Sequence, residues 1–150
     1  MTTATSKAGT THPTTIREHE LLQVERANAT GLRPVVFVHG LWLLPSSWDR
    51  WAMAFEAAGY TALTPGWPDD PMTVAEGNAH PELFAHKTVG QVADHYDEVV
   101  GELKIKPAII GHSFGGLLAQ ILAGRGLAAV TVAIDPAPFR GVLPLPFSAL

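Results

Sequence analysis

The 150-residue sequence contains no cysteine, which excludes disulfide bonds, thiolate metal ligands and a cysteine nucleophile. It is also poor in positive charge, with ten lysines and arginines against fourteen acidic residues and a formal net charge of −4. These basic residues are scattered along the chain, and Lys104 and Lys106 are their one close pair. No basic stripe follows the chain, so we predict no nucleic-acid partner.

Long hydrophobic runs are missing as well. The most apolar stretch, residues 117–134, is interrupted by a glutamine, two glycines and an arginine, which is typical of a helix followed by a strand. Residues 1–15 are small, polar and rich in threonine, without the apolar core of a signal peptide. We therefore predict a flexible N-terminal tail over 1–15, no membrane association and a cytoplasmic protein.

From residue 34 onward, apolar runs rich in β-branched residues alternate with amphipathic segments, in a composition that is 47% hydrophobic. Buried strands are predicted at residues 34–40, 60–66, 107–110 and 127–135. Strands that alternate with helices are the pattern of an α/β domain. We therefore predict a mostly parallel sheet with helices on both faces.

Three helices are predicted between these strands. The first begins at a Ser46 or Ser47 cap and ends near Ala58. Its apolar face is expected to comprise Trp48, Trp51, Met53 and Phe55. The second helix follows a Thr88 cap, and the third ends near Gly124.

Two segments have a less decisive pattern. Residues 15–28 are compatible with one or two edge strands or with a short helix. Residues 67–87 contain three prolines and little periodicity, so they are predicted to form a surface loop with room for one helical turn.

Residues 111–115 read Gly-His-Ser-Phe-Gly and fit the pattern Gly-x-Ser-x-Gly between an apolar strand and a leucine-rich helix. In so sharp a turn, side chains at Gly111 and Gly115 would collide with each other and with the neighbouring strand. Ser113 is then presented at a helix N-terminus, where the dipole favours a developing oxyanion. His112 is expected to point away from it and to bond backbone beneath the turn.

A second feature ends the first predicted strand, where His39 and Gly40 are followed by Leu41. Glycine at this point lets backbone approach a bound acyl group. The N–H groups of Leu41 and Phe114 are predicted to form a pair that faces an oxyanion, with His39 and Gly40 as structural residues of the loop.

The stretches "VVFVHGLW" and "AIIGHSFGG" together resemble the α/β-hydrolase superfamily, in its serine esterase and lipase branch. The resemblance covers residues 34–136, where "VAIDPAP" is similar to the strand that follows the nucleophile turn. It implies an α/β-hydrolase fold and cleavage of a carboxylic ester, lactone or related acyl bond. Ser113 would be the nucleophile, the substrate a small ester-like molecule, and no metal or organic cofactor would be needed.

One part of the family pattern is absent. Its catalytic residues follow the order serine, acid, histidine, but Asp135 is the one carboxylate after Ser113, and no histidine follows it. All seven histidines precede the serine: His12, His19, His39, His80, His86, His95 and His112. Asp135 is a candidate triad acid or an ordinary strand terminus. His80, Glu82 and His86 lie in a loop without fixed ligand spacing, so no metal site is predicted.

These features lead to the expectation that the chain is the N-terminal part of a hydrolase. Residues 16–150 would be an incomplete domain that lacks its last strands and its lid. The chain would end where a cap region begins, and its final strand would be an unpaired sheet edge. Such a chain is predicted to be inactive alone. The alternative is a non-catalytic protein of the same fold, either one that binds a small molecule in a pocket lined by tryptophans or an interaction protein.

Overall fold

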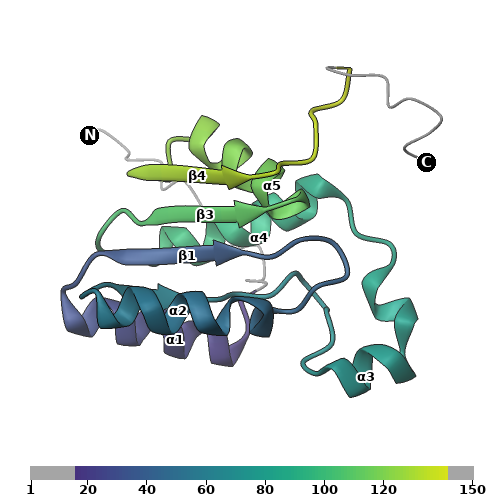
Figure 1. Ribbon diagram of the computed structural model, residues 1–150, viewed down its shortest axis with the longest axis horizontal. Helices are drawn as coiled ribbons and strands as arrows, with labels where there is room; N and C mark the ends of the chain where they lie inside the picture. Colours follow the sequence, from purple (N-terminus) through teal and green to yellow (C-terminus); the bar gives the residue numbers. More distant parts are fainter. Residues whose placement is uncertain (1–15, 142–150) are drawn as a thin grey trace, which may run out of the picture.

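The computed structural model describes residues 16–141, which contain one parallel sheet flanked by helices (Figure 1). Its strands are β1 (Pro34–Val38), β2 (Thr61–Leu63), β3 (Ala108–His112) and β4 (Val130–Ile134). They lie in the order β2-β1-β3-β4, and every pairing is parallel. The predicted strands and their parallel arrangement are confirmed. Residues 1–15, predicted to be a flexible tail, lie outside the described residues, as does the predicted start of a cap after residue 141.

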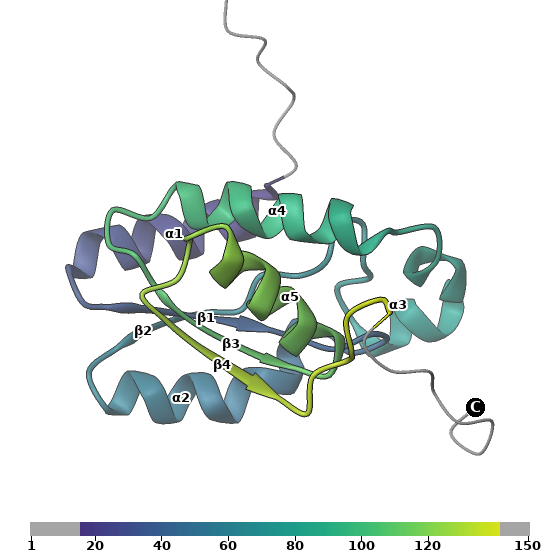
Figure 2. The ribbon, with the colours of Figure 1, turned by 90° about the horizontal axis from the view of Figure 1, so that it is seen from above.

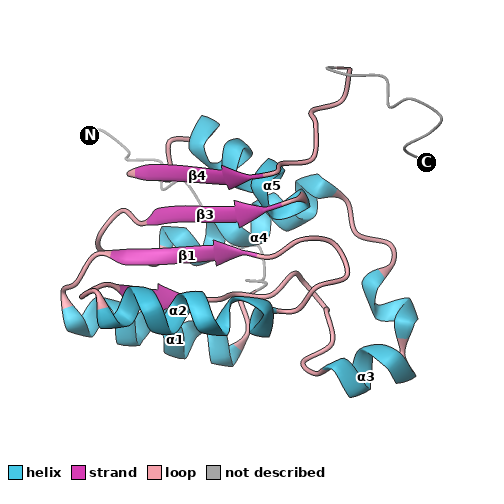
Figure 3. Ribbon diagram, viewed as in Figure 1, coloured by secondary structure: helices cyan, strands magenta, loops and turns pink. Residues whose placement is uncertain are grey.

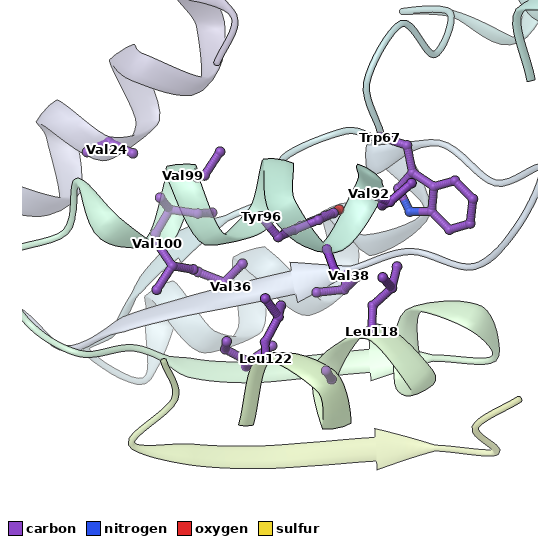
Figure 4. Close-up of a cluster of buried hydrophobic side chains, with 14 of the residues drawn as sticks. Val24, Val36, Val38, Trp67, Val92, Tyr96, Val99, Val100, Leu118 and Leu122 are labelled. Carbon is purple, nitrogen blue, oxygen red and sulfur yellow. The ribbon is translucent and has the colours of Figure 1, made fainter. Parts of the chain in front are cut away.

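Helices cover both faces of the sheet, as predicted (Figure 2). One face carries α1 (Glu18–Thr30), α4 (Val89–Gly101) and α5 (Phe114–Gly124), and the other carries α2 (Asp49–Ala57). The larger core lies beneath α4 and α5, where Tyr96 and Leu122 pack toward Val36 and Val38 of β1 (Figure 4). Because β1 is buried on both faces, its sequence is apolar throughout rather than alternating.

The segment with two open interpretations is a helix. α1 ends at Gly31, whose φ of 65° is the left-handed conformation that suits glycine at a helix terminus. Its polar side chains occupy the outer edge of β2: Arg26 donates to the Ala62 carbonyl at 2.7 Å, and Gln23 accepts from the Thr64 N–H at 2.7 Å. This edge of the sheet is therefore closed to a further strand.

The opposite edge is different. Within the described residues, β4 pairs with β3 alone, and its outward residues Val130 and Val132 are 59% and 43% exposed. The prediction that the last strand is a sheet edge is confirmed. Apolar edge strands with unpaired backbone groups favour self-association.

Two local predictions are corrected. Neither Ser46 nor Ser47 caps α2, because a 3-10 turn at Pro45–Trp48 leads directly into the helix, with Trp48 at the cap position. Of the predicted apolar face, Trp48 is buried, whereas Trp51 and Met53 are 48% and 63% exposed. The Thr88 cap of α4 is confirmed, since its hydroxyl accepts from the Gln91 N–H.

Residues 67–87 are more ordered than predicted. They contain the short helix α3 (Val74–Ala79) and a 3-10 turn at Pro81–Phe84, which lie beyond the carboxyl ends of the strands (Figure 3). The segment is anchored at its ends by buried Trp67 and by an ion pair between Asp70 and Lys87. Periodicity did not reveal these anchors because each is a single side chain.

Candidate active site

Ser113 alone joins β3 to α5, since the strand ends at His112 and the helix begins at Phe114. Its φ of 56° and ψ of −122° are strained for a residue with a side chain, at a cost of about 1–3 kcal/mol. Hydrogen bonds from both sides hold this conformation. The Ser113 N–H donates to the Ile134 carbonyl at 3.0 Å, and its carbonyl accepts from the Ala137 N–H at 3.0 Å. The segment after β4 therefore helps to fix the serine.

The glycines around Ser113 leave no room for a side chain. A Cβ at Gly111 would lie 2.0 Å from the Gly115 carbonyl oxygen, and a Cβ at Gly115 would lie 2.0 Å from the Val38 carbonyl oxygen. Gly116 is less tight, with a Cβ position 3.1 Å from Pro136. Helix α5 thus begins in direct backbone contact with β3 and β1.

The loop after β1 lies against this turn. A Cβ at Gly40 would be 3.3 Å from both the Ser113 Cβ and the His112 carbonyl oxygen. The side chains of Leu41 and Phe114 pack against the larger core. Within residues 16–141 the backbone N–H groups of these two residues have no protein acceptor. The structure therefore leaves both predicted donors unused, one of them at a helix N-terminus.

His39 is fully buried beneath this loop. Its Nδ1 lies 3.0 Å from the Gly40 carbonyl oxygen, and its ring stacks on Trp67 with centroids 5.6 Å apart. Burial lowers the pKa of His39 to about 4, and the positive charge of Lys87 acts in the same direction. The imidazole is therefore neutral at physiological pH.

Residues 35–150 match the model of the alpha/beta hydrolase family. The chain belongs to the α/β-hydrolase family. Its fold class, predicted from the sequence, is thereby confirmed. No curated protein matches the sequence.

Solved structures of other α/β-hydrolases resemble this one. A monoacylglycerol lipase from Paleococcus ferrophilus is 25% identical, with a TM-score of 0.57 over 75% of this chain and 42% of the lipase. A thioesterase domain from the curacin biosynthetic pathway is 18% identical, with a TM-score of 0.56 over 75% of this chain and 42% of that domain. An extracellular α/β-hydrolase from a Paenibacillus species is 23% identical, with a TM-score of 0.54 over 71% of this chain and 42% of that protein. This chain thus spans about two fifths of the length of these structures.

Among the hydrogen bonds of residues 16–141, none joins a histidine to Ser113. The predicted backbone bond of His112 is also absent from this part of the chain. Its side chain instead lines a cavity of about 230 Å³ together with Trp48, Trp51 and Ile134. Within the described residues, Ser113 and the loop after β1 therefore lie together without a histidine bonded to the serine.

Asp135 directly follows β4, with a left-handed φ of 41° and an exposed side chain. Across the described range it forms no hydrogen bond or ion pair with a histidine. The structure thus leaves its two predicted interpretations, triad acid and strand terminus, both open as proposals.

A buried pair between Glu20 of α1 and His95 of α4 was not predicted from the sequence. Both side chains are 1% exposed, and Nε2 of His95 lies 3.1 Å from Oε1 of Glu20. The Glu20 carboxylate also accepts from the N–H groups of Arg17 at 2.9 Å and Gly66 at 3.0 Å. Burial alone would raise the pKa of Glu20, but these hydrogen bonds outweigh it and the pKa lies below its usual range.

A second hollow, of about 300 Å³, lies between the loop after β1 and α3. Trp42, Leu43, Val74 and Phe84 contribute apolar surface to it. Trp42 is 72% exposed and has a left-handed φ of 61°, so the loop holds a large apolar side chain in solvent at some conformational cost. None of the helices in the described part of the chain has the length and apolarity that crossing a membrane requires.

Proposed function

We propose that this chain carries the nucleophile and the oxyanion hole of a serine hydrolase that cleaves carboxylic esters or related acyl bonds of small molecules. The observation that carries the proposal is the strained Ser113 between two glycines that cannot hold a side chain. Strain of this kind is kept where a function requires it. The monoacylglycerol lipase and the thioesterase domain are named for acyl-bond chemistry, which supports the same class of substrate.

In the proposed reaction, Oγ of Ser113 attacks the carbonyl carbon of the acyl bond. The oxygen that becomes negative is received by the N–H groups of Leu41 and Phe114, which have no other acceptor in the described chain. Each such donor is worth about 3–4 kcal/mol of barrier in a preorganised site. Collapse of the intermediate expels the alcohol, and water then releases the acid from the serine. The same groups would serve acyl transfer to another acceptor.

The serine hydroxyl needs a base to take its proton, and no described histidine is in contact with it. We therefore propose that a group outside residues 16–141 supplies the base. On this proposal the 150-residue chain alone turns over little or no ester. Asp135 is the candidate for the acid that would orient such a base.

A second candidate is a non-catalytic protein that binds a small apolar molecule. Two observations favour it: the cavity lined by Trp48 and Trp51, and the lack of a hydrogen bond from a described histidine to Ser113. Two results together would support this candidate instead. The folded 150-residue chain would bind an apolar ligand saturably. A longer in-frame form would hydrolyse no ester, and Ser113→Ala in that form would leave ligand binding unchanged.

The test measures hydrolysis of p-nitrophenyl esters of different chain lengths. The 150-residue chain is compared with a form extended by the coding sequence that follows in frame after Leu150. The extended form is expected to hydrolyse an ester, and its Ser113→Ala variant to lose at least about 10³-fold in kcat. A control variant Arg50→Ala, altered at an exposed residue of α2 that lines neither cavity, should keep its activity. Equal rates for wild type and Ser113→Ala would refute the assignment.

A further inference from the structure

The buried ring of His39 has a defined tautomer. A carbonyl oxygen only accepts hydrogen bonds, so the 3.0 Å contact between Nδ1 and the Gly40 carbonyl requires the proton on Nδ1. In a neutral ring Nε2 then carries a lone pair. This atom is buried and has no hydrogen-bond partner among the described residues. The one polar contact of the His39 side chain in this part of the chain is therefore to the backbone of the oxyanion loop.

The Gly40 carbonyl receives a second donor, the Leu43 N–H at 3.2 Å. Two donors from different positions fix the direction of a carbonyl more firmly than one. The described chain has no cis peptide bond, so the unit that joins Gly40 to Leu41 is trans and planar. In such a unit the N–H points opposite to the C=O. Fixing the Gly40 carbonyl consequently fixes the direction of the Leu41 N–H.

The same residues are in direct contact with the nucleophile turn. A Cβ at Gly115 would lie 2.7 Å from the His39 carbonyl oxygen, and a Cβ at Gly40 would lie 3.3 Å from the Ser113 Cβ. The position of the His39 ring is restricted, because the ring is fully buried and stacked on Trp67. A small rotation of the Gly40 carbonyl would thus move the Leu41 N–H relative to Ser113. Misplacement of a catalytic group by about 1 Å costs on the order of 100-fold in rate.

We infer that His39 is a positioning residue of the oxyanion hole, whose Nδ1–H holds the Gly40 carbonyl so that the Leu41 N–H faces the oxyanion formed at Ser113. The catalytic consequence of this inference rests on the proposed function. The arrangement of His39, Gly40 and Leu41 does not depend on it. The inference goes beyond a structural role for His39, because the hydrogen bond rather than the bulk of the ring sets the donor's direction. His39 takes no part in proton transfer, since its Nδ1–H is bonded to the Gly40 carbonyl and its Nε2 is buried without a hydrogen-bond partner among the described residues.

The test compares His39→Asn with His39→Leu in the extended form of the protein. The two new side chains have nearly the same shape, but the asparagine amide can donate from the place of Nδ1 and leucine cannot. Both lose the stacking on Trp67, which controls for packing. His39→Leu is expected to lower kcat about 10- to 100-fold with KM little changed, and His39→Asn to stay within about threefold of wild type. Equal losses in both variants, or a loss confined to KM, would overturn the inference.

A second measurement needs neither turnover nor a variant. In the 15N-histidine NMR spectrum of the wild-type 150-residue chain, His39 should show protonated Nδ1 and bare Nε2, unchanged between pH 5 and 8. A proton on Nε2, or titration within that range, would overturn the inference even if His39→Leu fails to fold. If the extended protein hydrolyses no ester, the proposed function fails. The tautomer and the absence of titration in the NMR spectrum then still decide whether His39 holds the Gly40 carbonyl.

Discussion

Replacing Gly115 by alanine tests whether helix α5 really begins in backbone contact with β1. The added Cβ would lie 2.0 Å from the Val38 carbonyl oxygen and 2.7 Å from that of His39, whereas real Cβ atoms essentially never come within 3.0 Å of another atom. Both neighbours are backbone atoms in a buried strand end, so neither can turn aside as a side chain would. The helix must move away from the sheet.

Overpacking of a well-packed core costs about 1–3 kcal/mol, and the rigid contacts here place Gly115→Ala at about 3 kcal/mol or more. Gly124→Ala is the matched control, because it lies in the same helix and its Cβ would meet nothing within 4 Å. Alanine is favoured over glycine in a helix by about 1 kcal/mol, so this control should be neutral or stabilised.

The assay is urea unfolding of the 150-residue chain, followed by circular dichroism. Gly115→Ala is expected to lower the midpoint strongly without a change in slope, and Gly124→Ala to leave it equal or higher. If Gly115→Ala is as stable as wild type, the close approach of α5 to β1 is wrong, and so is the geometry derived for Ser113.

Two further predictions concern α1. Because the pKa of Glu20 is lowered in the folded state, its contribution to stability is present above the unfolded pKa near 4.5 and is lost as pH falls through the folded value. Glu20→Gln should therefore weaken the dependence of the urea midpoint on pH below 4.5. Because it disrupts the bond to His95, it should also lower the free energy of unfolding by about 1–3 kcal/mol at pH 7. A pH dependence below 4.5 equal to that of wild type would contradict this. Arg26→Ala should expose the Ala62 carbonyl at the outer edge of β2 and increase self-association, measured by sedimentation velocity. The control Arg50→Ala, at an exposed residue of α2, should not. Equal sedimentation of the two variants would show that Arg26 does not protect this edge from self-association.

The sheet and the sharp turn at Ser113 were predictable because their signals are local. Each buried parallel strand is a short apolar run, and the spacing of Gly111 and Gly115 around Ser113 reflects contacts within a few residues of the turn. That these strands pair in parallel follows from the alternation of strands and helices along the chain, whereas their order in the sheet was not predicted.

The remaining features depend on contacts between distant parts of the chain. Helix α1 was indistinguishable from edge strands because Glu20, which fixes it, is buried against His95, 75 residues further along. Likewise, residues 67–87 after β2 are anchored by the ion pair between Asp70 and Lys87. In the sequence these two residues are indistinguishable from surface charges. The tautomer of His39 could not be predicted either, since it depends on one carbonyl in three dimensions.

The central claim is that Ser113 is a reactive nucleophile when a base is supplied, and one measurement addresses it directly. The extended form and the 150-residue chain are treated with a fluorophosphonate, digested, and analysed by peptide mass spectrometry. The account predicts an adduct on the peptide that contains Ser113 in the extended form, little labelling of the 150-residue chain, and none in Ser113→Ala. An adduct on a different residue, or labelling that survives Ser113→Ala undiminished, would contradict it.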